Sequence, residues 1–220
     1  MPSLLPLAAT VVALFSAPPP ARRPAFEIAH VEKAAALRAR PGGPVVARVG
    51  TRTEFGSPER LAVARRRGPW LGLVTTKRPN GRLAWVRSGS VTVASTRMSL
   101  ILDLSKRTLV LERGAKVVRR MKVGIGRASS PTPTGRFGVT DKLDGRAYGA
   151  YYGCCIIALS AHQPRLPAGW PGGDRIAIHG TNAPSTIGAR ASAGCAHARD
   201  ADLRILMRRV PLGAPVFIHA

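Results

Sequence analysis

The stretch IHGTNAPSTIGARASAGC, residues 178–195, contains the two residues on which the interpretation of the chain depends. His179 ends an apolar segment of strand length, and Cys195 follows small residues shortly before an amphipathic segment. The intervening residues are enough for a loop to return the cysteine to the end of the strand. A thiolate is the nucleophilic form of cysteine, and a nearby imidazole can take the thiol proton. The stretch is therefore a candidate nucleophilic site.

The residues next to Cys195 favour the same chemistry. Small neighbours leave room for a substrate carbonyl, and the backbone N–H groups of Gly194 and Cys195 are candidate donors to an oxyanion. A histidine and a cysteine at this spacing are equally compatible with a buried structural thiol. The pair alone leaves both interpretations open.

The second half of the chain has the pattern of a mainly β domain with one late helix. Apolar segments of strand length lie at residues 100–104, 108–111, 117–123, 136–140, 154–159, 175–179 and 214–218. From Leu203 to Val210, apolar side chains follow the i, i+3, i+4, i+7 spacing of a helix. We expect Asp200 or Asp202 to cap this helix.

Residues 25–96 predict a separate small β-domain. Short apolar segments at 45–49, 61–64, 70–74 and 83–86 alternate with Gly- and Pro-containing turns, a pattern that favours a small barrel. Trp70 and the segment NGRLAWV at 80–86 resemble the bacterial SH3-like domain. An unrelated small β-domain is the alternative. We expect both tryptophans, Trp70 and Trp85, to belong to the core.

The N-terminal segment LLPLAATVVALFSA, residues 4–17, predicts a secretion signal because it is apolar and ends in small residues. Prolines and a pair of arginines follow, so residues 1–24 are interpreted as a signal and linker, with cleavage between residues 17 and 21. No Lys or Arg precedes the segment, and Phe15 departs from the usual cleavage pattern. The protein is expected to be exported to the cell envelope.

The net charge of +23 is spread over the chain, with +11 in residues 1–96 and +12 in residues 97–220. Arginine supplies 28 of the 34 cationic residues. A nucleic-acid-binding arm concentrates its charge, and no zinc-finger spacing or phosphate-binding glycine loop is present, so no nucleic-acid partner is expected. The dense run Arg65–Arg67 is interpreted as a loop tip. An anionic polymer is the partner that the charge favours.

The adjacent Cys154 and Cys155 fall in a predicted strand, where successive side chains point to opposite faces. They match no zinc-site spacing, and a disulfide between neighbours is rare, so two structural thiols are expected. The alternative is that one of them lines a cleft near Cys195. His162 is interpreted as a loop residue. No metal or other cofactor is expected.

Four segments together resemble the L,D-transpeptidase (YkuD) family. They are PTPTGRF at 131–137, IHGTN at 178–182, SAGC at 192–195 and VPLGAPV at 210–216, and WPGGDR at 170–175 also fits the family. They occur in the family's order. The resemblance implies a mainly β fold, in which a small SH3-like barrel at 25–96 precedes a YkuD-type, β-sandwich-like catalytic domain at 97–220 with one late helix.

The resemblance also implies roles for particular residues. Cys195 is the nucleophile and His179 the general base. The Gly180 carbonyl orients the imidazole, Gly194 contributes an oxyanion donor, and Ser192 shapes the loop by hydrogen bonding.

Members of the family acylate their cysteine on a peptidoglycan tetrapeptide stem, release D-alanine and form 3-3 cross-links. Carbapenems acylate the same cysteine. Two alternatives remain for this chain: an L,D-carboxypeptidase that uses the same residues, and a non-catalytic protein that binds peptidoglycan in the wall.

The chain departs from the family pattern next to the cysteine. Ala193 replaces a frequent histidine, and His197 replaces the usual Arg or Asn two positions after Cys195. Arg199 or Arg190 are candidates to compensate for the missing arginine. The family keeps a tyrosine near its cleft. All three tyrosines between 148 and 152 are candidates, with Tyr152 as the working choice.

Overall fold

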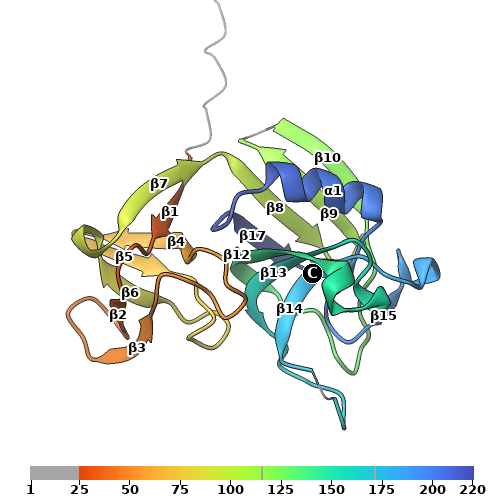
Figure 1. Cartoon of the computed structure of the whole chain (residues 1–220), viewed down its shortest axis with the longest axis horizontal. Helices are drawn as coiled ribbons and strands as arrows, with labels where there is room; N and C mark the ends of the chain where they lie inside the picture. Colours follow the sequence, from red (N-terminus) through yellow and green to blue (C-terminus); the bar gives the residue numbers. More distant parts are fainter. Residues whose placement is uncertain (1–24, 115, 171) are drawn as a thin grey trace, which may run out of the picture.

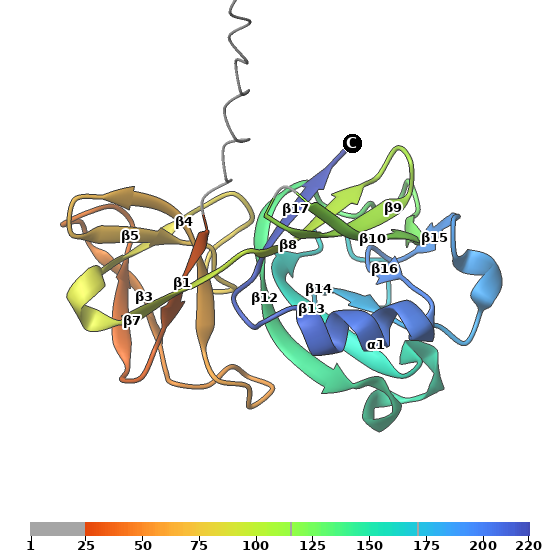
Figure 2. The same cartoon turned by 90° about the horizontal axis from the view of Figure 1, so that it is seen from above.

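The computed structural model describes residues 25–114, 116–170 and 172–220. The predicted secretion signal at 1–24 lies outside these residues. Two β-rich lobes lie side by side, and strand β7 continues into β8 as the connection between them (Figures 1 and 2). Both lobes are built from curled sheets, and the expectation of a mainly β protein with one late helix is confirmed for the described residues.

The first lobe contains a seven-stranded sheet within the described residues, in the order β3-β2-β6-β5-β4-β1-β7. Its elements are β1 (Phe26–His30), β2 (Ala35–Arg38), β3 (Val45–Val49), β4 (Arg60–Arg67), β5 (Trp70–Leu73), β6 (Ala84–Arg87), the 3₁₀ turn η1 (Ser88–Ser90) and β7 (Thr92–Thr96). Its own core includes Leu37, Leu61 and Leu71, each fully buried. The SH3-like character of this lobe stays a prediction.

The run Arg65–Arg67 is not a loop tip. It forms the last three residues of β4 and pairs with β5, with the turn at Gly68 following it. The side chains point into solvent, where Arg66 forms an ion pair with Glu27 at 2.6 Å. Trp85 belongs to the core as expected, whereas Trp70 is partly exposed beneath the guanidinium of Arg87. The arginines that the turn signal attributed to a loop therefore lie at the end of a paired strand.

The second lobe is an eight-stranded sheet in the described residues, in the order β10-β9-β8-β17-β12-β13-β14-β16, with a short parallel pair β11–β15 beside it. Its elements are β8 (Met98–Asp103), β9 (Thr108–Arg113), β10 (Lys116–Lys122), β11 (Ile125–Gly126), β12 (Gly135–Asp144), η2 (Gly145–Tyr148), η3 (Ala150–Tyr152), β13 (Cys155–His162), β14 (Arg175–His179), η4 (Pro184–Thr186), β15 (Arg190–Ser192), β16 (Ala196–His197), α1 (Asp200–Arg209) and β17 (Pro215–His219). Each strand expected after residue 97 corresponds to one of these strands, with ends shifted by a few residues.

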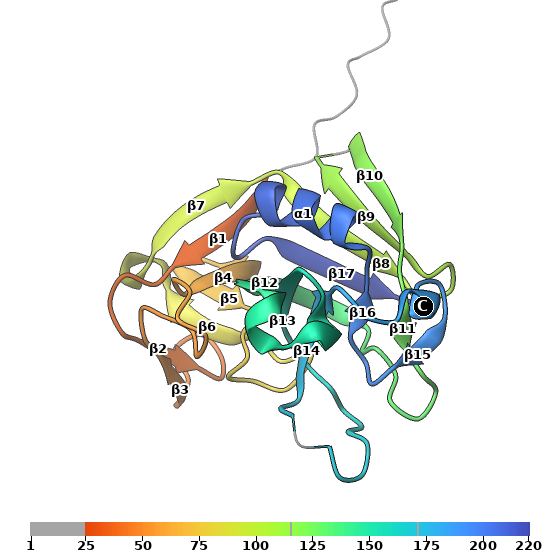
Figure 3. The same ribbon diagram turned by 45° about the vertical axis from the view of Figure 1, so that its right-hand side comes forward.

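Helix α1 packs on β13 through the predicted apolar side chains, of which Leu203 and Leu206 are fully buried (Figure 3). The predicted cap is wrong: Arg199 occupies the N-cap position and no side chain caps the helix. The two candidate carboxylates bind other parts of the fold. Asp200 accepts the N–H of Cys154 at 3.2 Å, and buried Asp202 accepts the Arg119 guanidinium at 2.8 Å. Within the described residues, no helix is long and apolar enough to cross a membrane.

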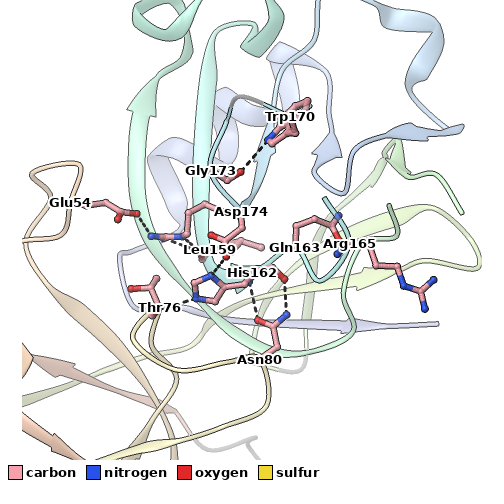
Figure 4. A network of polar contacts seen from close by, with 11 residues as sticks. Glu54, Thr76, Asn80, Leu159, His162, Gln163, Arg165, Trp170, Gly173 and Asp174 are labelled. Carbon is pink, nitrogen blue, oxygen red and sulfur yellow. Dashed lines mark hydrogen bonds and ion pairs between the residues drawn. The ribbon is translucent and has the colours of Figure 1, made fainter. Parts of the chain in front are cut away.

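The two lobes have separate hydrophobic cores, and we propose that they correspond to domains at 25–96 and 97–220. They are joined by direct hydrogen bonds. The guanidinium of Arg136 on β12 donates to the carbonyls of Val63 (2.7 Å) and Ala64 (3.1 Å) on β4. The Asn80 side chain pairs with both backbone groups of His162, at 2.7 and 2.9 Å (Figure 4). The first lobe is therefore held in a defined position against the sheet that carries β13 and β14.

We predict that Gly213→Ala destabilises the protein more than two control substitutions. Gly213 has φ +77°, and a Cβ there would lie 2.4 Å from the Ile28 side chain of the first lobe. Gly114→Ala adds only the left-handed backbone cost of about 1–2 kcal/mol, because at φ +65° its Cβ meets nothing within 4 Å. Gly89→Ala adds neither cost. Urea unfolding measures the loss in free energy of unfolding for each variant. Equal losses for Gly213→Ala and Gly114→Ala would contradict a tight contact between the lobes.

Candidate active site

A cavity of about 240 Å³ lies in the second lobe beside β13 and β14, and both His179 and Cys195 line it. Much of its wall is aromatic, from Tyr148, Tyr151, Tyr152, Trp170 and Phe55. The segment between β13 and β14, which carries Trp170, extends away from the sheet (Figure 3). The strand-end histidine and the loop cysteine thus share one pocket, as their spacing suggested.

His179 is fully buried at the end of β14, between β13 and β16. Its Nδ1 lies 2.6 Å from the carbonyl oxygen of Gly180. A carbonyl only accepts, so Nδ1 carries the proton and the lone pair of the neutral ring is on Nε2. Within the described residues, Nε2 is buried and has no hydrogen-bond partner. The ring therefore has an unoccupied basic nitrogen.

The pKa of His179 is lowered to about 4, chiefly because burial disfavours the charged ring, with the neighbouring His197 adding to the effect. The hydrogen bond to Gly180 acts in the opposite direction. At neutral pH the imidazole is uncharged and able to accept a proton.

Gly180 leaves no space for a side chain. A Cβ there would lie 2.6 Å from the Asp200 carboxylate, 2.7 Å from the Cα of Gly153 and 2.8 Å from the Tyr152 carbonyl. Any larger residue would displace this backbone and with it the carbonyl that binds Nδ1. The close approach explains why glycine follows the histidine.

The Cys195 sulfur accepts the Ala177 N–H at 3.4 Å and lies 3.9 Å from the Arg175 carbonyl. Burial raises the pKa of the thiol to about 11, and the N–H of Ala177 partly opposes this shift. The resting pair is therefore a neutral thiol and a neutral imidazole. Proton transfer would accompany nucleophilic attack instead of preceding it.

Ser192 shapes the loop that carries the cysteine. Its Oγ donates to the Cys195 carbonyl at 2.6 Å and accepts the Gly194 N–H at 3.0 Å. The Gly194 N–H is thus bound within the loop in this structure, and Gly194 has φ +124°, a conformation that favours glycine. Gly194 contributes to the loop's shape, which leaves the Cys195 N–H as the oxyanion donor to consider.

Two residues that sequence reasoning did not assign to the site hold the same loop from outside. The Thr132 hydroxyl donates to the Gly194 carbonyl at 2.7 Å, and the Gln163 amide donates to the Ala193 carbonyl at 2.7 Å. A Cβ on Gly194 would lie 1.9 Å from that amide nitrogen. Thr132 belongs to the PTPTGRF segment, which marked the family but carried no role. Nothing in the sequence around Gln163 indicated its contact.

His197 is buried and lies beside His179, with ring centroids 4.9 Å apart. The Thr186 hydroxyl donates to the Ala183 carbonyl (2.7 Å), so it accepts from Nδ1 of His197 (2.9 Å). Nε2 then faces the Tyr151 hydroxyl at 3.5 Å. Burial lowers the pKa of His197, which keeps the ring neutral. An arginine here would place a permanent charge next to the buried base.

The arginines expected to compensate lie elsewhere. Arg199 and Arg190 are exposed, and neither is among the described residues that line the pocket. Arg175, which ends the WPGGDR segment and was given no role there, does line it. Its guanidinium donates to the Leu159 carbonyl (2.9 Å) and to the Thr140 hydroxyl (2.8 Å). An arginine at the start of an apolar strand carries no signal that would distinguish this role.

All three tyrosines line the pocket. The Tyr152 ring lies 4.9 Å from the His179 ring, and the Tyr151 ring lies 5.5 Å from it. Tyr148 is further out, 6.4 Å from Tyr152. Burial is the main cause that raises the pKa of both Tyr151 and Tyr152, so both hydroxyls stay protonated at neutral pH.

The expectation of two separate thiols is wrong, because Cys154 and Cys155 form a disulfide with each other. Both are buried, and neither is among the described residues that line the pocket. Strand alternation does not separate the two side chains, since β13 begins only at Cys155. His162 is likewise no loop residue. It ends β13, and its ring contacts Asp174 (2.8 Å) and the Thr76 carbonyl (2.9 Å) (Figure 4).

The fold and pocket together describe a mainly β protein with a histidine and a free cysteine in one aromatic cavity. The sequence pattern of the YkuD family, the L,D-transpeptidase catalytic domain, matches residues 97–218. The chain belongs to this family.

Named relatives agree with this assignment. The Bacillus subtilis protein named "Putative L,D-transpeptidase YkuD" is 28% identical over 122 residues, which cover 54% of this chain and 65% of the relative. The Salmonella typhimurium protein named "Probable L,D-transpeptidase ErfK/SrfK" is 32% identical over 139 residues, which cover 56% of this chain and 45% of the relative. The chain thus spans less than two thirds of these relatives.

Solved structures of L,D-transpeptidases are also similar to this chain. An L,D-transpeptidase from Mycobacterium smegmatis is 17% identical with a TM-score of 0.46, and the match covers 89% of this chain and 99% of the M. smegmatis chain. L,D-transpeptidase 3 of Mycobacterium tuberculosis, in complex with a faropenem-derived adduct, is 16% identical with a TM-score of 0.46, covering 63% of this chain and 73% of its own.

We predict that iodoacetamide alkylates native Cys195 slowly at pH 7 and faster as the pH approaches 11, because burial raises the thiol's pKa to about 11. His179→Ala lowers the rate, because the base that takes the thiol proton is lost, but leaves the shape of the pH profile above pH 6 unchanged, since the pKa of about 4 keeps the ring neutral there. Mass spectrometry at a series of pH values follows the reaction. A rate that is already maximal below pH 7 would instead indicate a thiolate–imidazolium pair.

The same reagent provides a control for the cysteine assignment. After unfolding without reductant, one thiol per chain is labelled, because Cys154 and Cys155 are joined. After reduction, all three cysteines are labelled. Three labels without reductant would contradict the disulfide.

Proposed function

We propose that this protein is an exported cysteine L,D-transpeptidase that acylates on a peptidoglycan tetrapeptide stem, releases D-alanine and forms 3-3 cross-links. One observation carries the proposal. The Gly180 carbonyl holds the buried His179 ring with Nε2 as its basic nitrogen, in the same pocket as the free Cys195 thiol. Membership of the L,D-transpeptidase family supplies the substrate class.

In the first half-reaction, the Cys195 sulfur attacks the carbonyl before the terminal D-alanine, and its proton passes to Nε2 of His179. The Cys195 N–H stabilises the oxyanion of the tetrahedral intermediate. When this intermediate collapses, the C–N bond breaks and the imidazolium returns its proton to the D-alanine amine. A thioester on Cys195 remains.

In the second half-reaction, the side-chain amine of another stem attacks the thioester. Nε2 of His179 accepts the amine proton, the C–S bond breaks, and the departing thiolate recovers a proton from the imidazolium. The new amide is the cross-link. Water in place of the amine would yield a tripeptide, which is the carboxypeptidase reaction.

The neutral resting pair suits this sequence. An imidazolium with a pKa near 4 is a stronger acid than an ordinary imidazolium, so it readily protonates the leaving amine. A thiol that is not ionised at rest is protected from unproductive alkylation and oxidation. Aromatic walls reduce the access of water to the thioester, which favours transfer to an amine.

We predict that the protein converts a disaccharide-tetrapeptide into free D-alanine and a cross-linked dimer. Cys195→Ala abolishes both products. His179→Ala lowers kcat by roughly 10²–10⁴, the usual contribution of a general base. Mass spectrometry identifies the products: a tripeptide alone would assign a carboxypeptidase, and neither product from the folded protein would contradict an enzymatic function.

The charge of +23 supports an envelope location, because an exported cation is attracted to anionic wall polymers. Such attraction is screened by salt. We predict that Cys195→Ala protein sediments with isolated cell walls at low ionic strength and is released as sodium chloride is added. Sedimentation independent of salt would contradict an electrostatic origin.

A further inference from the structure

One wall of the pocket comes from the first lobe. Phe55 lies in the loop between β3 and β4 and lines the same cavity as His179 and Cys195. Its ring lies 6.4 Å from that of Tyr148 in an edge-to-face arrangement, and the Arg175 guanidinium lies 5.9 Å from its centroid. The cavity is thus built jointly by both lobes.

The loop that carries Phe55 is tied to the second lobe through the two residues that precede the aromatic ring. Glu54 forms an ion pair with Arg175 of β14 (Figure 4). The Thr53 hydroxyl donates to the carboxylate of Asp141 on β12, which is fully buried. Inside the loop, Ser57 N–H donates to Thr53 Oγ1 at 3.1 Å. Phe55 is therefore held in place before any ligand binds.

A row of aromatic rings leads from Phe55 to the catalytic imidazole. The successive ring centroids of Phe55, Tyr148, Tyr152 and His179 are 6.4, 6.4 and 4.9 Å apart. An extended peptide advances about 3.3 Å per residue. The row is consequently no longer than roughly five extended residues. A disaccharide-tetrapeptide has three residues and its sugars on that side of the reacting carbonyl, so it is a donor long enough to approach Phe55.

The outer members of the row are incompletely buried. Phe55 is 38% exposed and Tyr148 48% exposed, so both have apolar surface for a ligand to cover. Because the loop is already fixed, little conformational entropy is lost when the ligand binds. The nearby Arg175 is bound to Glu54, Thr140 and Leu159, so it offers the ligand little free charge.

We propose that Phe55 is a specificity-determining residue, through which the first lobe binds the part of an extended stem-peptide donor that lies remote from the scissile bond. This proposal rests on the proposed function. Phe55 takes no part in the chemistry. It selects donors long enough to reach the first lobe.

The test compares a long and a short donor. For the disaccharide-tetrapeptide, Phe55→Ala raises KM about tenfold, the scale of one lost aromatic contact, and leaves kcat within about twofold. For an N-acetylated dipeptide that ends in D-alanine and stops short of Phe55, both constants stay at the wild-type value. Phe55→Tyr restores the KM of the long donor.

A second variant tests the position of the loop. Glu54→Gln removes the ion pair with Arg175 and is expected to raise KM for the long donor in the same direction as Phe55→Ala. Glu27→Gln is the matched control. It removes an exposed ion pair with Arg66 in the same lobe, and Glu27 is not among the described residues lining the pocket.

The outcomes separate this proposal from the proposed function. Equal KM values for wild type and Phe55→Ala, or an equal rise for both donors, would overturn the role of Phe55 while leaving the transpeptidase reaction intact. If wild type turns over neither donor, the proposed function fails. Calorimetric binding of the tetrapeptide to Cys195→Ala, with and without Phe55→Ala, then decides the role of Phe55: unchanged affinity overturns it, and a loss of about tenfold supports it.

Discussion

The hydrogen bond from Nδ1 of His179 to the Gly180 carbonyl is the interaction on which the site depends. It fixes the tautomer of a fully buried ring and leaves Nε2 as the base. The surrounding residues fix the position of this carbonyl. Gly180 is packed closely against Gly153 and the Asp200 carboxylate, which restricts movement of its backbone. The Asp200 carboxylate, in the first turn of α1, accepts the N–H of Cys154 and does not cap the N-terminus of its own helix.

The loop that carries Cys195 is also held by hydrogen bonds to its backbone carbonyls. Ser192 binds it internally, and Thr132 and Gln163 bind its carbonyls from two other segments. Only glycine fits at position 194, because the Gln163 amide occupies the space that a Cβ would need. The Cys195 thiol is therefore placed by its loop and the His179 ring by the end of β14, and the Ala177 N–H of the same strand binds the sulfur. The first lobe adds Phe55 to the same cavity, which makes the pocket a product of both lobes.

Local patterns predicted much of this architecture. β3 and β14 have the predicted bounds because apolar runs between turn residues are a local signal. His179 and Cys195 were found because their motif is contiguous. The contact of Asp200 was missed because the carboxylate binds a distant N–H group and not its own helix end. The Cys154–Cys155 disulfide was missed because the strand begins only at Cys155, so side-chain alternation does not apply to the pair. Phe55 lies more than a hundred residues from His179, and no local pattern reports such a contact.

Acylation of Cys195 with help from His179 is the step on which the proposed reaction depends. The most direct measurement is the intact mass of the folded protein after brief exposure to a carbapenem. We expect one covalent adduct, mapped by peptide analysis to Cys195, absent in Cys195→Ala and formed more slowly in His179→Ala. A folded wild-type protein that gains no adduct, or gains it at another residue, would contradict the account.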